Sequence, residues 1–578
     1  MREPVSIYCD WALHDELGDD VRLSEELAMG VLDVLERWKR DHGVKFDYYL
    51  LDCFWFKQPG DYTAFDPETW PDGFGPACRR MHQMGLKPGL WLDTTGAAVA
   101  GWRPWEEGEA EHGWQPWTES LNARNRWSHC LFDGPYVDGL RDAMLHACRK
   151  WGVRLFKFDF ADFKAVTARY RDLCAGEVYR RNVEAFRRVC ADVRDEFPDL
   201  LILAYNGFAY ASNYLNNTTG RVVPGVEPHW LDVIDWLYSG DPRPADVPCG
   251  SLRRAVNAYQ DHMVCKFHHS GIPLDHIDDH GCMVGGANTI FYLGKRGWRG
   301  AWIRSLARGG RKAHFYGDVG LLDDGDIEFL KRVRGLFFDL FRRAAATELL
   351  GGVPCQSPWH GFLTGDGQDG LLTLVNMSAE PAQVRLSEPT ADTAALLFHD
   401  EGYEPELEAG PDGLSVLLAP EQMALIGLGR KAAEECRLGT DVSADPVPQD
   451  AERLALEFQP HERGLTCRIS GENLLAEAED RFEALRLSFR LREDGDAHRQ
   501  RTARGVPVPE ALQMEVEADG RSVAPTKLVP DVPVWAGCSW VTGLYPLGPL
   551  ASAGQVDIRF TCPDSEVDIF GEAWLQNG

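Results

Sequence analysis

The feature that most constrains the fold is an alternation of strand-like and helix-like segments over residues 1–345 of this 578-residue chain. A parallel sheet needs a crossover, usually a helix, between successive strands. About eight such strand–helix units therefore predict a (β/α)8 barrel, with a doubly wound open sheet as the alternative. No Gly-x-Gly-x-x-Gly turn follows a strand, and this disfavours a dinucleotide-binding fold.

Hydrophobic periodicity locates the individual elements. The expected strands are 5–9, 46–53, 87–92, 155–160, 200–205, 232–237, a weak one at 272–274, and 312–316. The expected helices are 24–42, 75–84, 135–151, 177–196, 253–268, 299–307 and 324–345. Boundary residues support these limits, because Ser24 is a typical first cap and Gly43 a typical terminator of the helix between them.

The pattern changes after residue 345. Short runs that alternate apolar and polar residues, separated by Gly- and Asp-rich turns, predict an antiparallel β-sandwich over 346–430. A second β-rich region covers 431–578, and a carbohydrate-binding, an oligomerisation and a purely structural role all fit it. The predicted class is therefore α/β: a catalytic (β/α)8 TIM barrel (1–345) followed by two antiparallel β-sandwich-like domains.

Composition narrows the range of partners. A formal net charge of -29 disfavours nucleic acid and anionic membranes as ligands. The 15 Cys contain no CxxC pair, so they favour buried apolar side chains over a zinc ribbon. The first residues lack the apolar core of a signal peptide, and no apolar run is long enough for a bilayer, which together predict a cytoplasmic protein.

Within the expected strand 155–160, aromatic residues alternate with Lys157 and Asp159. A period of two places this cation and this carboxylate on the same face of the strand. Burying both is costly unless they pair or bind something. Two interpretations remain: an ion pair inside the sheet, or the reactive carboxylate of a sugar-cleaving enzyme.

Acidic residues also follow the expected strands in register. Because the carboxyl ends of barrel strands converge on one mouth, these residues are expected to lie near one another. A single Asp after a strand is usually a cap or turn residue, so two or three of them are expected to be only that. The six residues are Asp10, Asp52, Asp93, Asp159, Asp241 and Asp318.

Glycoside hydrolysis usually needs two carboxyl groups on either side of the anomeric carbon. Asp159 and Asp241 are the best pair, and Lys157 is expected to keep Asp159 ionised. Asp241 follows a Tyr-Ser-Gly turn and would need a raised pKa to hold a proton near neutrality. The alternative for Asp241 is a turn residue in front of Pro242.

Several segments occur in the order found in one group of enzymes. They are 50–55, 65–74, 85–92, 157–159, 238–241 and 316–318. Together they resemble the melibiase-like α-glycosidases, the α-galactosidases of glycoside hydrolase families 27 and 36 and their relatives, over about residues 1–430. The resemblance implies a retaining enzyme without a cofactor, with Asp159 as the nucleophile and Asp241 as the general acid/base.

The same resemblance implies that Lys157 and Asp52 bind sugar hydroxyls. The chain departs from the family pattern at Leu51, where a first acid is expected, at Leu237, where an Arg is often found, and at Tyr205-Asn206. Contacts to galactose are therefore partly missing. Retaining α-glycosidase chemistry is better supported than galactose as the substrate.

Other residues are candidates for substrate contact. Trp55, Trp91 and the Trp-rich segment 102–127 suit either sugar stacking or core packing, whereas the segment 268–280 suits a metal site, a substrate loop or a polar turn. Its spacing matches no standard zinc motif, so no metal is predicted. Asp278 or Asp279 would replace Asp241 if that residue is not the proton donor. The full set expected to bind substrate is Asp10, Asp52, Trp55, Trp91, Asp93, Lys157, Asn206, Asp279 and His280.

The function predicted is a retaining exo-α-glycosidase that acts on a terminal galactose-like sugar through a covalent glycosyl-Asp intermediate. One alternative is a retaining α-glycosidase or transglycosidase for a different or substituted pyranoside. Another is a carbohydrate-binding protein whose barrel has lost turnover. The expected partner is a carbohydrate, with neither nucleic acid nor membrane, and homo-oligomer formation is left open.

Overall fold

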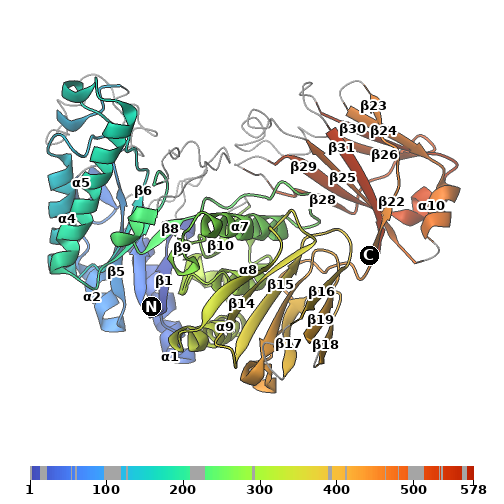
Figure 1. Cartoon of the computed structure of the whole chain (residues 1–578), viewed down its shortest axis with the longest axis horizontal. Helices are drawn as coiled ribbons and strands as arrows, with labels where there is room; N and C mark the ends of the chain where they lie inside the picture. The colour runs from blue at the N-terminus through green and yellow to red at the C-terminus, as the bar shows by residue number, and fades with distance from the viewer. Residues whose placement is uncertain are drawn as a thin grey trace.

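The computed structural model describes most of the chain, with a continuous α/β part followed by β-rich parts (Figure 1). Among these residues, no helix is both long and apolar enough to cross a bilayer. The described residues are 3–13, 23–53, 55–58, 61–96, 119–124, 128–208, 228–288, 293–387, 393–410, 413–461, 464–478, 481–491, 513–532, 534, 538–562 and 569–577.

A curled parallel sheet, like that of a TIM barrel, forms the first part of the chain. Its strands are hydrogen-bonded in the order β11-β10-β12-β1-β2-β5-β6-β7-β8-β9, and all neighbours are parallel except β10 and β11. The bounds are β1 (Val5–Cys9), β2 (Tyr48–Leu51), β5 (Lys87–Asp93), β6 (Leu155–Asp159), β7 (Leu201–Ala204), β8 (Trp236–Tyr238), β9 (Ile277–Asp278), β10 (Cys282–Asn288), β11 (Leu293–Gly294) and β12 (Lys312–Gly317).

Three residues, 279–281, join β9 at one end of this sheet to β10, the second strand from the other end. On one side of them Asp278 in β9 pairs with Tyr238 in β8, and on the other Cys282 in β10 pairs with Phe315 in β12. His280 within this link has φ +66, a left-handed conformation that few residues adopt. The link therefore carries its side chains to the place where the sheet curls back on itself.

Helices cover the outside of the curled sheet, and α4 and α5 lie side by side on one flank (Figure 1). The first helix begins as its sequence predicts, because the Ser24 hydroxyl accepts a hydrogen bond from the Leu27 amide at 3.1 Å, and Gly43 ends it with φ +68. The helices are α1 (Glu25–His42), α2 (Gly75–Met84), α4 (Tyr136–Trp151), α5 (Ala175–Glu196), α7 (Leu252–His269), α8 (Trp298–Ala307) and α9 (Asp324–Arg342). A hairpin of β3 (Phe56–Gln58) and β4 (Asp61–Phe65) precedes α2.

Four antiparallel or largely antiparallel sheets follow α9. The first two pack their apolar faces together around residues such as Leu374, Val384 and Ile426. Their strands, in sheet order, are β13 (Ala346–Gly351), β14 (Trp359–Gly365), β15 (Gly370–Asn376), β20 (Met423–Leu428), β17 (Ala394–Asp400) and β21 (Gly439–Asp441), then β16 (Ala382–Leu386), β19 (Gly413–Leu418) and β18 (Glu406–Gly410).

The last two sheets have five strands each and lie near the end of the chain. They also pack face to face, since Phe489 of one sheet stacks on Phe560 of the other with ring centroids 4.3 Å apart. In sheet order they are β22 (Ala451–Leu454), β31 (Ile569–Gln576), β25 (Ala484–Leu491), β29 (Trp540–Pro546) and β28 (Lys527–Val529), then β23 (Gln459–His461), β24 (Gly464–Ile469), β30 (Val556–Thr561), β26 (Gln513–Ala518) and β27 (Arg521–Ser522), with helices α10 (Gly471–Ala478) and α13 (Leu547–Ala551).

The elements expected within 1–345 overlap an observed strand or helix, with one exception. The weak strand at 272–274 is wrong, because Leu274–His276 forms a 3-10 turn and the strand is Ile277–Asp278. Pro273 explains the shift, since its ring fixes φ and it has no amide hydrogen for a sheet ladder.

A buried ionic cluster connects α7 and α8 to the sandwich. Arg308 Nε lies 2.7 Å from Asp261, Arg304 also pairs with Asp261, and His360 Nε2 from β14 lies 2.7 Å from the same carboxylate. Burial alone would raise the pKa of Asp261, but the two guanidinium groups hold it well below its usual range. Asp261 is therefore shared by two buried guanidinium groups, and Asp279 is a second partner of Arg308.

We predict that Asp261→Asn lowers the free energy of unfolding by about 3–5 kcal/mol, because it leaves buried guanidinium groups uncompensated. Urea denaturation followed by tryptophan fluorescence measures this loss. The control is Asp41→Asn, which breaks an exposed pair with Arg40 and should leave the free energy of unfolding almost unchanged. Equal effects of the two substitutions would contradict the importance of the buried cluster.

Candidate active site

An ion pair lies at the carboxyl end of the curled sheet. Lys157 Nζ in β6 is 2.8 Å from Asp52 Oδ2, which follows β2, and the two side chains are 3% and 1% exposed. Burial disfavours the charged ammonium, but the charge of Asp52 outweighs it and raises the pKa of Lys157 above its ordinary value. Lys157 is therefore a permanent cation whose closest charged partner is Asp52.

Aromatic rings surround the same ammonium group. Lys157 Nζ lies 4.2 Å from the ring centroid of Tyr205, 5.7 Å from that of Tyr316 and 5.8 Å from that of Trp11. The negative faces of these rings attract a cation, an effect that grows when water is excluded. The cation is consequently held in place by contacts from several strands.

Asp159, the last residue of β6, is fixed by backbone amides. Its Oδ1 accepts hydrogen bonds from the amides of Phe160 at 2.8 Å and Asn206 at 3.1 Å, and its Oδ2 accepts one from Trp91 Nε1 at 3.4 Å. Phe160 has φ +50, so the chain turns sharply immediately after the carboxylate. The sheet thus holds Asp159 in one orientation.

The expectation that Lys157 keeps Asp159 ionised is corrected by the structure. Burial raises the pKa of Asp159 to about 7, and the opposing effect of Lys157 is too small to cancel this. The physical reason is that the ammonium is paired with Asp52. Among the described residues around Lys157, the buried acids Asp10, Asp52 and Asp159 outnumber this cation, and a proton on Asp159 relieves the imbalance.

Asp241 follows β8 by three residues and is half-buried. The Tyr238 hydroxyl donates a hydrogen bond of 2.6 Å to Asp241 Oδ1, and the Tyr238 ring stacks on Tyr205 at 4.1 Å. The charge of Asp241 also contributes to the raised pKa of Asp159. Asp159, Lys157 and Asp241 are therefore linked through Tyr205 and Tyr238 at the same end of the sheet.

His280 lines the same region. Its ring is buried, with centroids 5.2 Å from Trp11, 5.2 Å from Tyr238 and 4.8 Å from Tyr316. Burial and the charge of Lys157 lower the pKa of His280 to about 3, so the imidazole is neutral. Among the described residues, its Nδ1 has no hydrogen-bond partner.

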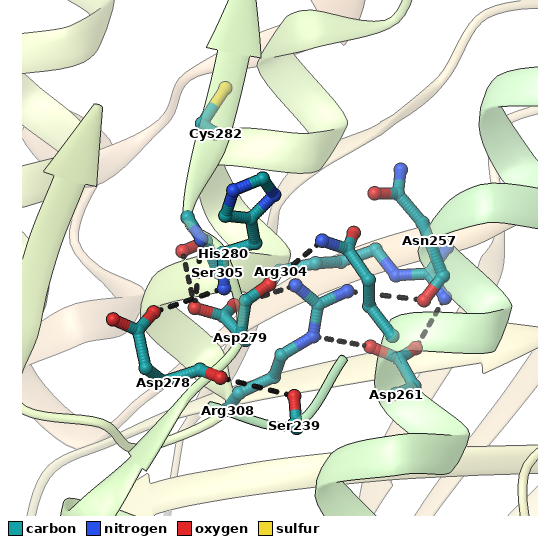
Figure 2. Close-up of polar contacts among 12 residues, drawn as sticks. Ser239, Asn257, Asp261, Asp278, Asp279, His280, Cys282, Arg304, Ser305 and Arg308 are labelled. Atoms are coloured by element: carbon teal, nitrogen blue, oxygen red, sulfur yellow. Dashed lines mark hydrogen bonds and ion pairs between the residues drawn. The ribbon is translucent and has the colours of Figure 1, made fainter. Parts of the chain in front are cut away.

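Asp278 and Asp279 belong to an ionic network beneath this site (Figure 2). Lys312 Nζ is 3.2 Å from Asp278 Oδ1, and Arg308 Nη1 is 2.7 Å from Asp279 Oδ2. Both carboxyls are buried, yet these cations lower the pKa of each. The expectation that either could replace Asp241 as a proton donor is therefore wrong, and Asp279 contacts cations of the sheet and α8.

The remaining strand-end acids have local partners. Asp93 Oδ1 accepts from the amides of Thr95 at 3.1 Å and Gly96 at 2.7 Å, and Asp318 Oδ1 accepts from Gly320 at 2.8 Å. These two hold turns, as expected for two or three of the six. Asp10 Oδ1 accepts from the Asp52 amide at 2.9 Å and so helps to place the partner of Lys157.

Trp55 and Trp91 are almost completely buried. Trp55 packs against Phe65 at 4.5 Å and donates to the Trp91 carbonyl at 2.9 Å, which is the environment of a core residue. Trp91 touches the site through its contact with Asp159. The Trp residues expected in the segment 102–127 lie outside the described residues, and sugar stacking by any Trp stays a prediction.

In the segment 268–280, His268 contacts the nearby Ile272 carbonyl at 3.0 Å, and His276 contacts the carbonyl of Asp235, before β8, at 2.9 Å. In the described part of the chain, no three His, Cys, Asp or Glu side chains are grouped as metal ligands. Of this segment, His280 is the residue that faces Lys157 and its aromatic neighbours.

Sequence reasoning gave no role to three tyrosines that shape the site. Tyr205, Tyr238 and Tyr316 surround Lys157 and His280, and the Tyr205 hydroxyl donates to Asp278 Oδ2 at 2.9 Å. The sequence does contain a signal for these tyrosines. Each one ends or follows an expected strand, and an Asn or Asp comes one to three residues after it. An aromatic residue followed by a polar one at several strand ends indicates that aromatic rings, as well as acids, line the carboxyl end of the sheet.

No family model and no curated protein matches this sequence. Solved structures do resemble it. They include a GH36 α-galactosidase from Geobacillus stearothermophilus in complex with 1-deoxygalactonojirimycin (12% identity, TM-score 0.49) and the α-galactosidase from Lactobacillus brevis (12%, 0.49). Each match covers 74% of this chain and 55% of the other, so this chain spans about half the length of these structures.

A GH27 β-L-arabinopyranosidase from Geobacillus stearothermophilus, in complex with arabinose, matches with 12% identity and a TM-score of 0.48. That match covers 74% of this chain and 97% of the other.

We predict that a buried carboxyl group titrates near pH 7 and belongs to Asp159. Infrared difference spectra between pH 5 and pH 9 should show its carboxyl C=O band converting to a carboxylate band with a midpoint of about 7. The band should be missing in Asp159→Asn and unchanged in Asp72→Asn, which alters an exposed carboxyl. A band that persists in Asp159→Asn would contradict the assignment.

Proposed function

We propose that this protein is a retaining exo-α-glycosidase that hydrolyses a terminal, galactose-like sugar, with Asp159 as the nucleophile and Asp241 as the general acid/base. The curled sheet and its helices would act as a (β/α)8 barrel whose carboxyl-end mouth is the active site. The observation that carries the proposal is the coupling of two carboxyls with different surroundings: Asp159 is fixed and buried, whereas Asp241 is half-buried on a loop.

In the first step, one oxygen of ionised Asp159 attacks the anomeric carbon while the bond from that carbon to the aglycone oxygen breaks. Asp241 gives its proton to the departing oxygen. Positive charge develops on the sugar ring, and a buried carboxylate stabilises it strongly because little water screens the interaction. The Phe160 and Asn206 amides bind Oδ1, which leaves Oδ2 as the attacking oxygen.

In the second step, the Asp241 carboxylate takes a proton from water as that water attacks the anomeric carbon. The bond between the sugar and Asp159 breaks, and the α-configuration is regained after two inversions. The short hydrogen bond from Tyr238 would orient Asp241 during both steps. No cofactor takes part in this sequence.

Lys157 and Asp52 would bind sugar hydroxyls, since an ammonium donates and a carboxylate accepts hydrogen bonds. His280 would face the sugar as a neutral ring. Leu51 and Leu237, at positions where acid and Arg are expected for galactose, are both buried in strands and provide no polar contact. A different or substituted pyranoside is therefore the second candidate, and a screen of aryl α-glycosides separates the two.

We predict that Asp159→Gly and Asp241→Gly each lower turnover of an alkyl α-glycoside on the order of 10³-fold or more, because each removes a group that the reaction needs. Added azide distinguishes the roles when the substrate is an activated aryl α-glycoside. With Asp241→Gly, azide should attack the glycosyl enzyme and give the α-azide. With Asp159→Gly, it should attack the substrate directly and give the β-azide.

Opposite azide stereochemistry in the two variants would show that the roles are reversed. A fluorinated glycoside should label wild-type Asp159, located by peptide mapping. Binding of sugars without turnover, unchanged in Asp159→Asn, would instead favour a carbohydrate-binding protein with a degenerate site. The matched control is Asp93→Asn, whose carboxyl holds a turn, and it should form the same labelled adduct.

We predict that kcat/KM falls about tenfold per pH unit below about pH 7. The sign follows from the nucleophile: Asp159 must be ionised to attack, and protonation below its raised pKa removes the active form. Lys157 lowers this pKa, so Lys157→Met should move the acidic limb to higher pH. A limb near pH 4, the ordinary range of an Asp, would contradict Asp159 as the titrating group.

A further inference from the structure

The loop that carries Asp241 is irregular yet largely buried. Residues 241–250 form neither helix nor strand, and the loop contains Pro242, Pro244 and Pro248, which fix φ and supply no amide hydrogen. Buried backbone groups of an irregular loop need partners, since an unsatisfied one costs free energy. One partner is near in sequence, because the Ala245 amide donates to the Ala255 carbonyl in α7 at 3.0 Å. The partners described next come from the β-rich part of the chain, far away in sequence.

The first partner is Glu421, which precedes β20 in the sandwich and is 3% exposed. The Gly250 amide donates to Glu421 Oε1 at 2.8 Å, and the Cys249 thiol donates to Oε2 at 3.0 Å. Arg486 Nη2, from β25, lies 2.6 Å from Glu421 Oε1. Burial would raise the pKa of Glu421, but Arg486 and these donors lower it, so the acceptor stays ionised.

The second set of partners comes from the last β-region. Trp540 Nε1 in β29 donates to the Ala245 carbonyl at 2.7 Å, and the Trp540 ring is fully buried. Arg486 Nη2 also reaches the Pro248 carbonyl at 3.5 Å, and Ser539 Oγ reaches Asp246 Oδ1 at the same distance. These contacts meet the loop at successive points between Ala245 and Gly250.

We infer that the last β-region, with Glu421 of the sandwich, positions the proton donor by clamping the loop 241–250. This inference rests on the proposed function of Asp241. Gly240, with φ +127, has a backbone conformation that favours glycine directly before Asp241, and the Tyr238 hydroxyl holds the Asp241 carboxyl from within the same turn. The anchored segment after Asp241 adds a restraint on the backbone, and Trp540 and Glu421 are positioning residues that act through it.

The test uses Trp540→Phe in the full-length protein, which removes the donor to Ala245 and keeps an aromatic ring in its place. A displaced proton donor slows substrates whose aglycone must be protonated, and leaves those with an activated aglycone almost unaffected. We expect kcat/KM for methyl α-galactoside to fall at least about tenfold, and that for 2,4-dinitrophenyl α-galactoside to change less than about threefold.

The matched control is Trp574→Phe, the same substitution in the same sheet. Trp574 Nε1 has no hydrogen-bond partner among the described residues, so its loss removes none. Glu421→Gln, which weakens the acceptor for Gly250 and keeps its shape, should repeat the selective effect of Trp540→Phe. Equal slowing of both substrates, or slowing of neither, in both loop-contact variants would overturn the inference.

Hydrogen exchange of the peptide 241–250 separates this inference from the proposed function. Its amides should exchange faster in Trp540→Phe than in wild type or Trp574→Phe. If wild type hydrolyses no aryl α-glycoside of the screen, the proposed function fails, while faster exchange still supports the clamp. Unchanged exchange together with an active wild type would reject the clamp and leave the glycosidase proposal intact.

Discussion

The buried ion pair of Lys157 and Asp52 governs the electrostatics of the site. The Lys157 ammonium pairs with the Asp52 carboxylate, which follows another strand, at 2.8 Å. Asp159 is left buried in a region of low dielectric, and its pKa is raised. A positively charged sugar ring would restore the balance of charge in the transition state. Under the proposed function, the buried carboxylate would favour a developing cation over a neutral ligand.

The network beneath the site has the opposite property. Among the described residues, its carboxylates and its cations match in number. Asp261 and Asp279 pair with Arg304 and Arg308 (Figure 2), and Asp278 pairs with Lys312. Burial lowers the pKa of His314 and of His360, so neither ring adds charge to this balance. Matched charges suit a structural role, whereas the unmatched carboxylate one layer above suits chemistry.

Much of the parallel sheet could be predicted because each strand and helix carries its own pattern. Ser24 and Gly43, for example, mark the ends of α1 in the sequence and in the structure. The strand-end position of Asp159 followed from the alternation in Leu155–Asp159 alone. The sequence could not predict which carboxylate pairs with Lys157. Asp52 is 105 residues away, and the two side chains come together only because β2, β5 and β6 are neighbours in the sheet.

The ion pairs of Asp278 and Asp279 could not be predicted from the sequence either. Their sequence gives two adjacent acids after a helix, which suit a substrate loop as well as an ion pair. Their cations lie on α8 and β12, and they meet only because residues 279–281 join β9 to β10. Local periodicity does not show which strands a loop connects across the sheet. The sequence alone therefore could not exclude Asp278 and Asp279 as alternative proton donors.

The two proposed catalytic carboxyls are held by different means. Asp159 is fixed by amides adjoining the sheet, within about 50 residues of sequence. Asp241 lies on a loop whose backbone partners include Glu421 and Trp540, far away in sequence. The nucleophile bonds to a single carbon atom, so its position can be fixed. The acid/base residue must first protonate the aglycone oxygen and then deprotonate a water, and a loop allows the small shift of its carboxyl between these two positions. Its anchors keep the adjustment small, which gives the distant β-rich regions a direct physical connection to the chemistry.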